Sequence, residues 1–470
     1  MGSFFVSKRK PRAKQAEALS LIEGREAFAL LMAMRTGKTK VIIDDWQRSG
    51  VPNLLVIAPA GVYKTWEEAL LDDVVDMSDV AVFTWESGKK KDTTDFMTHL
   101  TRRVLLMNVE ALSTVQAARE LCIEFLDGGE AMAAVDESVV IKTPGAKRTK
   151  WILAEVAPRA KFRRILSGLP SPKSPLDLFC QFWFLDPKIL GFAKYKQFCY
   201  RYATWKKIRS GGRWIEIVDQ YINLEELAAK IEPYSFRVNL EDCYDLPPAT
   251  YIRREVPLTE EQKRIYAELK TKATAELEGG GHVTADLVVT QLLRLHQVLC
   301  GHTRDEQDVL HAIPEHRTRS LLQLLDDHSG HALVWCSYDS DIRKVSEALA
   351  KHFKTPVARF WGGNKDTREA EEVMFKTDPA CRFMVATAAA GGRGRTWDGA
   401  DLVVYFSSSP DLDLRLQSEQ RAQNVGKNRS VAYVDLVCSG TVEEKIITSL
   451  RNKLNMASII TGDNFREWLI

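Results

Sequence analysis

Residues Leu30-Leu31-Met32-Ala33-Met34-Arg35-Thr36-Gly37-Lys38-Thr39 begin as an apolar strand, turn sharply and end in Gly-Lys-Thr at the expected start of a helix. This pattern predicts a phosphate-binding loop, because backbone N–H groups around Gly37 can surround a polyphosphate at the positive end of the helix dipole. Lys38 can reach the terminal phosphates, Thr39 can offer its hydroxyl to Mg²⁺, and Arg35 and Thr36 complete the loop. Since Met32 stands where the full consensus has glycine, an ordinary strand–turn–helix remains open at this point.

The composition indicates a globular chain with more than one domain. At 470 residues it is long for a single core, so two domains of about 200 residues each are expected. Hydrophobic residues make up 45% and charged residues 27%, and the apolar runs are too short to span a bilayer. Basic residues follow the apolar N-terminal residues instead of preceding them, which argues against a secretory signal and predicts a cytoplasmic protein without membrane contact. The eight cysteines form no Cys-x-x-Cys pair, so neither a zinc site nor a disulfide framework is indicated.

Short apolar runs alternate with helical patterns in both halves of the chain. Such alternation predicts an α/β fold with doubly wound parallel sheets, which place ligands at the carboxyl ends of their strands. We expect one domain over residues 1–240, with an irregular aromatic and basic insertion over 185–239, and a second over 241–470. The predicted strands cover residues 54–59, 104–108, 131–137 and 162–168, then 332–336, 383–386, 402–406 and 432–436.

The net charge of +2 does not by itself indicate a nucleic-acid-binding protein, but two local clusters are basic. Cations that alternate with aromatic rings suit a phosphate backbone and its bases. The other interpretation of the second cluster, a solvated face over a small aromatic core, remains equally open. The first cluster comprises Lys142, Lys147, Arg148 and Lys150; the second comprises Lys194, Lys196, Arg201, Lys206, Lys207, Arg209 and Arg213 among Tyr195, Phe198, Tyr200, Tyr202, Trp205 and Trp214.

A second nucleotide motif is predicted at Val135-Asp136-Glu137-Ser138, where an apolar strand ends in two carboxylates. Unpaired carboxylates at the end of a buried strand are costly, which favours a functional interpretation over a structural one. Asp136 can bind Mg²⁺ through water, and Glu137 can orient and deprotonate an attacking water. Together with the phosphate loop, this motif predicts ATP and Mg²⁺ as cofactors.

With both nucleotide motifs in place, the chain resembles the superfamily 2 helicases and translocases, in particular the Swi/Snf branch and its compact phage-encoded members. The resemblance rests on several motifs in the family's order and spacing over nearly the whole chain. Besides the two nucleotide motifs, they are Gln15, Ala58-Pro59 with Thr65-Trp66, Ile141-Lys142-Thr143-Pro144 with Lys147-Arg148, Ser167-Gly168-Leu169-Pro170, Ala390-Gly391-Gly392-Arg393-Gly394, and residues 417–426.

The resemblance implies two RecA-like domains in tandem that couple ATP hydrolysis to movement on DNA. It implies that Gln15 reads adenine and that Gly394 lies at the nucleotide, and it makes Arg421 a candidate catalytic cation. It also implies nucleic-acid contacts at Pro59, Thr65, Trp66, Lys142, Lys147, Arg148 and Gly391. The expected protein is a monomer that acts on duplex, forked or branched DNA, with RNA as an open alternative.

Two positions depart from the family pattern. Val139 stands where many relatives have histidine, and Asn424 stands where the resemblance calls for the arginine that stabilises the transferring phosphoryl group. Because such an arginine is worth about 10³–10⁵ in rate, Asn424 puts fast hydrolysis in question. Arg421 remains, with Arg393 or Arg395 as possible substitutes.

Three functions are therefore weighed against one another. The first is an ATP-dependent DNA helicase or translocase. The second is a nucleotide-gated DNA-binding scaffold with weak or no ATPase activity, for which Asn424 is the direct argument. The third is an unrelated phosphate-loop enzyme such as a small-molecule kinase, which the second α/β half and the late motifs oppose.

Overall fold

The computed structural model describes residues 7–86, 93–99, 101–210, 213–244, 249–278, 285–305, 307–391, 397, 399–422 and 430–461. These residues form two compact units. The first unit contains the residues up to Thr204, the segment Gln220–Asp245 and the last helix from Met456 onward. The second unit contains the segments Trp205–Asp219 and Leu246–Asn455. No described helix is both long and apolar enough to cross a membrane.

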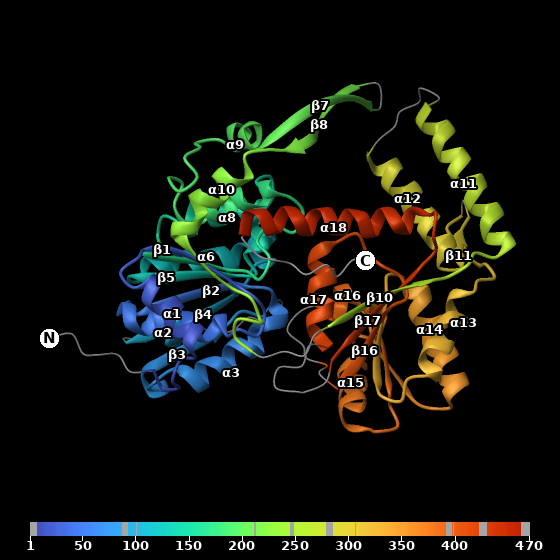
Figure 1. The fold of residues 1–470 in the computed structure, drawn as a ribbon. Coiled ribbons are helices and arrows are strands. Elements are labelled where there is room, and N and C mark those ends of the chain that lie inside the picture. Colours follow the sequence, from blue (N-terminus) through green and yellow to red (C-terminus); the bar gives the residue numbers. More distant parts are fainter. Residues whose placement is uncertain are drawn as a thin grey trace. The chain divides into compact units, whose positions relative to one another are not determined.

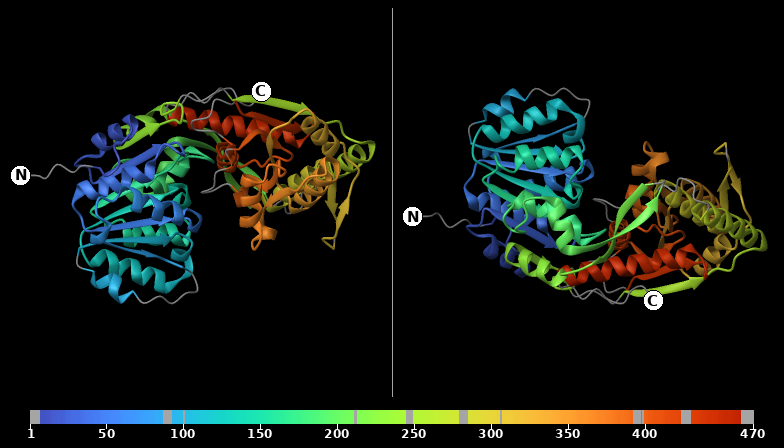
Figure 2. Two further views of the ribbon diagram at one scale, coloured as in Figure 1. Left: turned by 90° about the horizontal axis from the view of Figure 1, so that it is seen from below. Right: turned by 90° about the horizontal axis from the view of Figure 1, so that it is seen from above.

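The first unit is built on a seven-stranded sheet in the order β3-β4-β2-β5-β6-β1-β9, in which every pairing is parallel. Several of its strands contain continuous apolar runs, as expected where helices cover both faces (Figures 1 and 2). The strands are β1 (Ala27–Met32), β2 (Asn53–Ala58), β3 (Val80–Thr84), β4 (Arg102–Asn108), β5 (Ala131–Asp136), β6 (Phe162–Leu166) and β9 (Ser235–Val238).

The helices of this unit fall into two packed groups. Helix α2 contacts both α1 and α3, whereas α6 and α8 each contact a π-helical turn, η4 (Ile152–Val156). The helices are α1 (Ala13–Ile22), α2 (Lys38–Ser49), α3 (Tyr63–Asp73), α4 (Thr94–Thr98), α5 (Ala111–Thr114), α6 (Gln116–Asp127), α7 (Lys147–Trp151), α8 (Leu178–Leu185), α9 (Tyr195–Tyr202) and α10 (Leu224–Ile231).

The second unit contains a six-stranded parallel sheet in the order β10-β17-β16-β13-β15-β14. Its strands are β10 (Thr250–Glu255), β13 (His331–Cys336), β14 (Val357–Phe360), β15 (Phe383–Thr387), β16 (Ala400–Tyr405) and β17 (Ala432–Val437), with β11 (His302–Arg304) and β12 (Leu310–Ala312) as a small antiparallel pair. Its helices are α11 (Glu260–Glu278), α12 (Ala285–Leu299), α13 (Arg317–Asp326), α14 (Asp339–Phe353), α15 (Arg368–Thr377), α16 (Ala388–Gly391), α17 (Leu412–Ala422) and α18 (Val442–Thr461). The predicted pair of doubly wound parallel-sheet domains is thus confirmed.

Residues 185–239 are less irregular than the sequence suggests. Strands β7 (Ala203–Ser210) and β8 (Arg213–Tyr221) pair as a two-stranded sheet of their own (Figure 1). The last of these residues form β9, which pairs with β1 and therefore belongs to the main sheet. The four-residue run Ser-Phe-Arg-Val gave no strand signal, because its arginine interrupts the apolar pattern.

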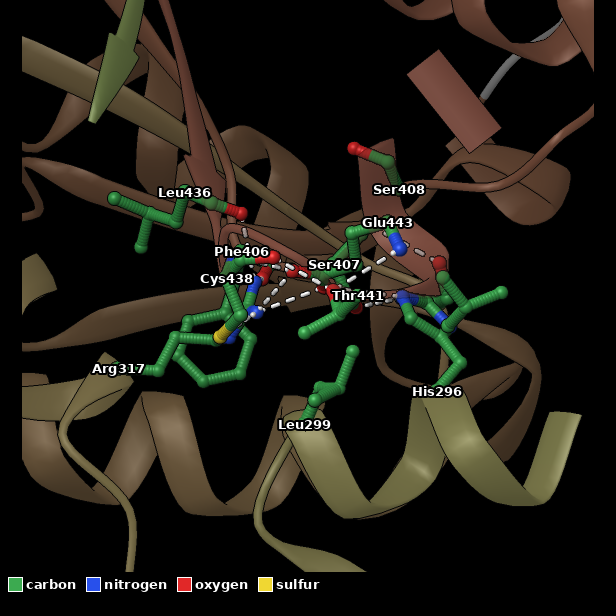
Figure 3. A network of polar contacts seen from close by, with 12 residues as sticks. His296, Leu299, Arg317, Phe406, Ser407, Ser408, Leu436, Cys438, Thr441 and Glu443 are labelled. Atoms are coloured by element: carbon green, nitrogen blue, oxygen red, sulfur yellow. Dashed lines mark hydrogen bonds and ion pairs between the residues drawn. The ribbon is translucent and has the colours of Figure 1, made fainter. Parts of the chain in front are cut away.

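A buried polar network holds several elements of the second unit together (Figure 3). Nη2 of Arg317 lies 2.7 Å from both carboxylate oxygens of Glu443, and Nη1 donates to the carbonyls of Phe406 and Leu436 at the ends of β16 and β17. His296 approaches Glu443 from α12 with an Nε2–Oε1 distance of 3.3 Å. Although His296, Cys300 and Glu443 are close enough to share a metal ion, the guanidinium of Arg317 already supplies the cation here.

Candidate nucleotide site and nucleic-acid surface

The predicted phosphate loop connects β1 to α2. Arg35 and Gly37 both have left-handed backbone conformations, with φ of 66° and 88°, and Gly37 is the N-cap residue of α2. The Thr36 hydroxyl donates to the carbonyl of Ala33 at 2.7 Å and thereby closes the turn. A side chain on Gly37 would be strained by this φ and would also collide with the amide of Gln15, so the loop needs glycine there.

Lys38 is the first residue of α2, and its ammonium lies within the loop. Nζ donates to the carbonyls of Met32 at 2.9 Å and Ala33 at 3.3 Å, and the residue is only 9% exposed. In the described part of the chain no carboxylate forms an ion pair with it. A buried ammonium without a counter-ion is costly on its own, so this arrangement favours an anionic ligand.

Gln15 lies against the phosphate loop. Its Nε2 approaches the carbonyls of Thr36 at 3.2 Å and Gly37 at 3.4 Å, while its Oε1 accepts the backbone N–H of Arg12. The Arg12 guanidinium also donates to the Thr36 carbonyl, at 3.1 Å. The start of α1 therefore fixes one wall of the loop.

Tyr244 completes this wall, although the sequence gave no signal for it. Its hydroxyl donates to the carbonyl of Arg35 at 3.1 Å, and Arg12 stacks over its ring at 5.0 Å. Tyr244 follows β9, which lies beside β1 in the sheet but far from it in the chain. Only the pairing of these strands brings the tyrosine to the loop, and the sequence does not show that pairing.

The second nucleotide motif begins at the end of β5, two strands from β1. Asp136 accepts the backbone N–H of Glu137 on Oδ1 at 2.9 Å, and Glu137 has a left-handed backbone with φ of 48°. Among the described residues Asp136 forms no ion pair. The Thr39 hydroxyl and the Asp136 carboxylate are the oxygen donors that Mg²⁺ prefers, and in this respect the two residues fit a magnesium ion.

Strand β6 lies between these two motifs and carries Ser167-Gly168-Leu169-Pro170 at its end. A Cβ on Gly168 would lie 3.6 Å from the backbone N of Met34, so this segment contacts the phosphate loop. On its other side, Gln181 accepts from the Ser138 hydroxyl at 2.7 Å and donates to the Pro170 carbonyl at 2.6 Å. Gln181 thus connects the second nucleotide motif with the segment that follows β6, a link that the sequence did not reveal.

The residues expected along a nucleic-acid backbone differ in accessibility. Pro59 is buried at the end of β2, and Thr65 is exposed on α3. Trp66 is fully buried, and its indole Nε1 donates to Oδ2 of Asp136 at 2.9 Å. The expected contact between nucleic acid and the Trp66 ring therefore does not fit this structure, because the ring packs inside the hydrophobic core.

The basic stretch around α7 also divides into structural and exposed side chains. Lys142 lies 3.8 Å from a carboxylate oxygen of Asp177, and Arg148 donates from Nε to the carbonyl of Val140 at 2.8 Å. Lys147 and Lys150 are exposed. They line an open groove on the first unit together with Ser113, Thr114, Arg119 and Trp151.

The aromatic and basic segment has a buried aromatic part and an exposed part. Phe198 and Tyr202 are buried and pack against one another and against Phe192, so this part forms an aromatic core. Trp214 on β8 is 69% exposed, and Lys206 of the same hairpin forms an ion pair with Asp219 at 2.8 Å.

In the second unit, Gly391 and Arg421 lie within described elements. A Cβ on Gly391 would collide with Trp397 and lie 3.2 Å from Trp335, so packing alone requires glycine at this position. Arg421 is 3% exposed near the end of α17, and its carbonyl accepts the backbone N–H of Trp397. Arg393, Gly394, Arg395 and Asn424 lie outside the described residues.

Comparison with known proteins identifies the family. Residues 8–304 match the model of the SNF2-related domain, and residues 316–426 match the helicase conserved C-terminal domain. The chain is 24% identical to TATA-binding protein-associated factor MOT1 of Saccharomyces cerevisiae over 70% of this chain and 20% of that protein. It is 24% identical to the putative ATP-dependent helicase/translocase YwqA of Bacillus subtilis, over 87% of this chain and 43% of that protein.

The DNA annealing helicase and endonuclease ZRANB3 of Bos taurus is also 24% identical, over 87% of this chain and 36% of that protein. The chain thus spans less than half the length of each of these relatives. The Sulfolobus solfataricus SWI2/SNF2 ATPase core in complex with dsDNA matches 98% of this chain with 23% identity and a TM-score of 0.42. Because the SNF2-related model alone covers more than half of the sequence, the chain belongs to the SNF2-related helicase family.

Proposed function

We propose that this protein is an ATP-dependent DNA translocase or helicase whose ATPase activity is stimulated by DNA. The observation that carries the proposal is the buried Lys38 ammonium, which has no carboxylate partner in the described structure and lies in a phosphate loop on the same sheet edge as Asp136 and Glu137. Nucleotide hydrolysis needs a cation that binds the phosphates, a carboxylate that binds the metal ion and a carboxylate that orients the attacking water.

Each residue then has a distinct role. Lys38 neutralises the terminal phosphates, Gln15 contacts the base, and Glu137 orients the attacking water and accepts its proton. Thr39 and Asp136 would hold Mg²⁺, which when bound neutralises charge on the phosphate oxygens. Arg421 stabilises the charge that develops on the transferred group, and Gly394 lies near the nucleotide.

The DNA surface of the first unit is proposed to include Thr65 and the groove at α7. Exposed lysines beside Trp151 suit a phosphate backbone, which is contacted without regard to base sequence. Lys142 and Arg148 support this groove through their own contacts, and Pro59 shapes the backbone at the end of β2. In the second unit, Gly391 is proposed as a separate contact to nucleic acid. The exposed Trp214 in its basic hairpin offers a ring on which an unpaired base could stack, which favours forked or branched DNA.

A steady-state ATPase assay tests this function directly. Phosphate release is measured without nucleic acid and with single-stranded DNA, duplex, a four-way junction or RNA. We expect DNA to raise turnover, and Lys38→Ala to abolish it while the variant remains folded and still binds DNA. Unchanged turnover of Lys38→Ala at saturating ATP would contradict the site assignment.

A further inference from the structure

The indole of Trp66 and the carboxylate of Asp136 form a buried contact between two parts of the first unit. Trp66 lies on α3, which follows β2, whereas Asp136 ends the neighbouring strand β5. The Nε1–Oδ2 distance is 2.9 Å, with Trp66 fully buried and Asp136 only 8% exposed. A charge-assisted hydrogen bond in such surroundings is stronger than one at the surface.

This contact is not explained by a general need to satisfy buried indole N–H groups. The indole nitrogens of Trp46 and Trp335 are also buried, and they have no hydrogen-bond partner. The chain therefore tolerates an unpartnered indole N–H elsewhere in its cores. The donor on Trp66 points at the one carboxylate that the proposed mechanism assigns to a metal ion.

The position of Trp66 is fixed from two directions. Its ring packs in the core cluster of the first unit, which includes residues of β1 and β2. At the end of α3, the buried Lys40 pairs with Asp73 at 3.2 Å and with Asp44 at 2.9 Å, which fastens this helix to α2. The indole donor consequently moves only when α3 moves relative to the sheet.

The Asp136 carboxylate is held through both oxygens. Oδ1 accepts the N–H of Glu137, and Oδ2 accepts the indole of Trp66. Together these bonds define the plane of the carboxylate, while each oxygen keeps a lone pair for a further donor or ligand. Removing a group that orients a metal ligand in this way typically lowers metal affinity by about 10- to 100-fold.

We propose that Trp66 is a positioning residue that aims Asp136 at Mg²⁺, and that it links α3 to the nucleotide site. This inference rests on the proposed function, in which Asp136 holds Mg²⁺ and the exposed face of α3 at Thr65 follows the nucleic-acid backbone. A displacement of α3 then changes the orientation of Asp136 through one hydrogen bond.

The test compares Trp66→Phe with Trp46→Phe in the full chain. Both changes remove a fully buried indole from the same unit, but only the first removes a hydrogen bond to a carboxylate. The Kd of a fluorescent ATP analogue is measured with EDTA and with saturating Mg²⁺. The Kd in EDTA divided by the Kd in Mg²⁺ reports how much the metal ion strengthens nucleotide binding. We expect Trp66→Phe to reduce this ratio by about 10- to 100-fold and Trp46→Phe to leave it unchanged.

A purely structural role for Trp66 would lower both affinities together and leave the ratio at the wild-type value, and this outcome would overturn the proposal. If Trp66→Phe does not fold, an isostere in which sulfur replaces the indole N–H is inserted at position 66 and must give the same loss. A wild-type protein whose nucleotide affinity shows no Mg²⁺ dependence, or does not depend on Lys38, would instead refute the proposed function.

Discussion

Glu443 is the most strongly perturbed carboxylate in the network that joins α12, α13 and α18. Burial alone opposes its ionisation, but the charge of Arg317 and the contact with His296 outweigh burial and lower the pKa of Glu443 to about 2. A depressed carboxyl pKa stabilises the folded state above the ordinary value of 4.5, and this stabilisation is lost as the pH falls toward 2.

Glu443→Gln should therefore destabilise the protein at pH 7 by about 3–5 kcal/mol, because it leaves Arg317 buried without its counter-ion. The difference in unfolding free energy between wild type and variant should shrink as the pH falls below 4.5. Urea unfolding at pH 7, 4.5 and 3 measures it. Glu444→Gln is the matched control, since it removes the same charge from a half-buried neighbour that pairs with Arg253. An equal loss of unfolding free energy in both variants would show that the Arg317–Glu443 pair contributes no more to stability than the Arg253–Glu444 pair.

The position of a candidate site residue in the fold could be predicted from sequence where it depends on one short motif. Lys38 and Asp136 each follow an apolar strand within one short motif, and the sheet brings them to one edge. Trp66 could not be placed in this way. Its motif predicted a contact with nucleic acid, whereas its ring is buried and its indole N–H donates to the carboxylate of Asp136. Tyr244 and Gln181 gave no signal, since their partners come from segments joined only by the folded sheet.

Helix α7 begins at Lys147, and this placement divides the basic stretch by function. Arg148 donates a hydrogen bond to the backbone carbonyl of Val140, whereas Lys147 and Lys150 line the groove beside Trp151. The sequence showed the cluster but not this division, because helix geometry and the position of Val140 determine which cations remain exposed. Reversing the charge of Arg148 would disturb the fold, so the exposed pair is the informative target.

The double variant Lys147→Glu/Lys150→Glu should weaken DNA binding by a similar factor for every sequence. If each lysine neutralises one phosphate, the slope of log K against log salt should decrease by about 2. Fluorescence anisotropy at several salt concentrations measures both quantities. Lys351→Glu, on an exposed position of α14, serves as the control for the charge change. An unaltered affinity and slope in the double variant would remove the groove from the DNA surface.

For the whole molecule, the alternation of strands and helices was sufficient to predict two parallel-sheet units. The placement of β9 and β10 was not predictable in the same way, since these short strands carry arginines and join sheets whose other strands lie elsewhere in the chain. Whether these units form a working motor depends instead on a few charged side chains, above all on Arg421 and the position of Asn424.

Asn424 allows a direct test of whether this chain hydrolyses ATP at the rate of a motor. If Arg421 alone stabilises the transferred phosphoryl group, Arg421→Ala should lower DNA-stimulated turnover by about 10³-fold or more, and Asn424→Arg should raise it. Because Arg421 is buried, circular dichroism must show that Arg421→Ala is folded, and Arg451→Ala on the exposed side of α18 is the control. If Asn424→Arg leaves a robust rate unimproved while Arg393→Ala or Arg395→Ala abolishes it, the preceding loop supplies the cation instead. A wild-type chain that binds DNA in a nucleotide-dependent way but hydrolyses nothing, and that Asn424→Arg does not activate, would be a nucleotide-gated scaffold and not a motor.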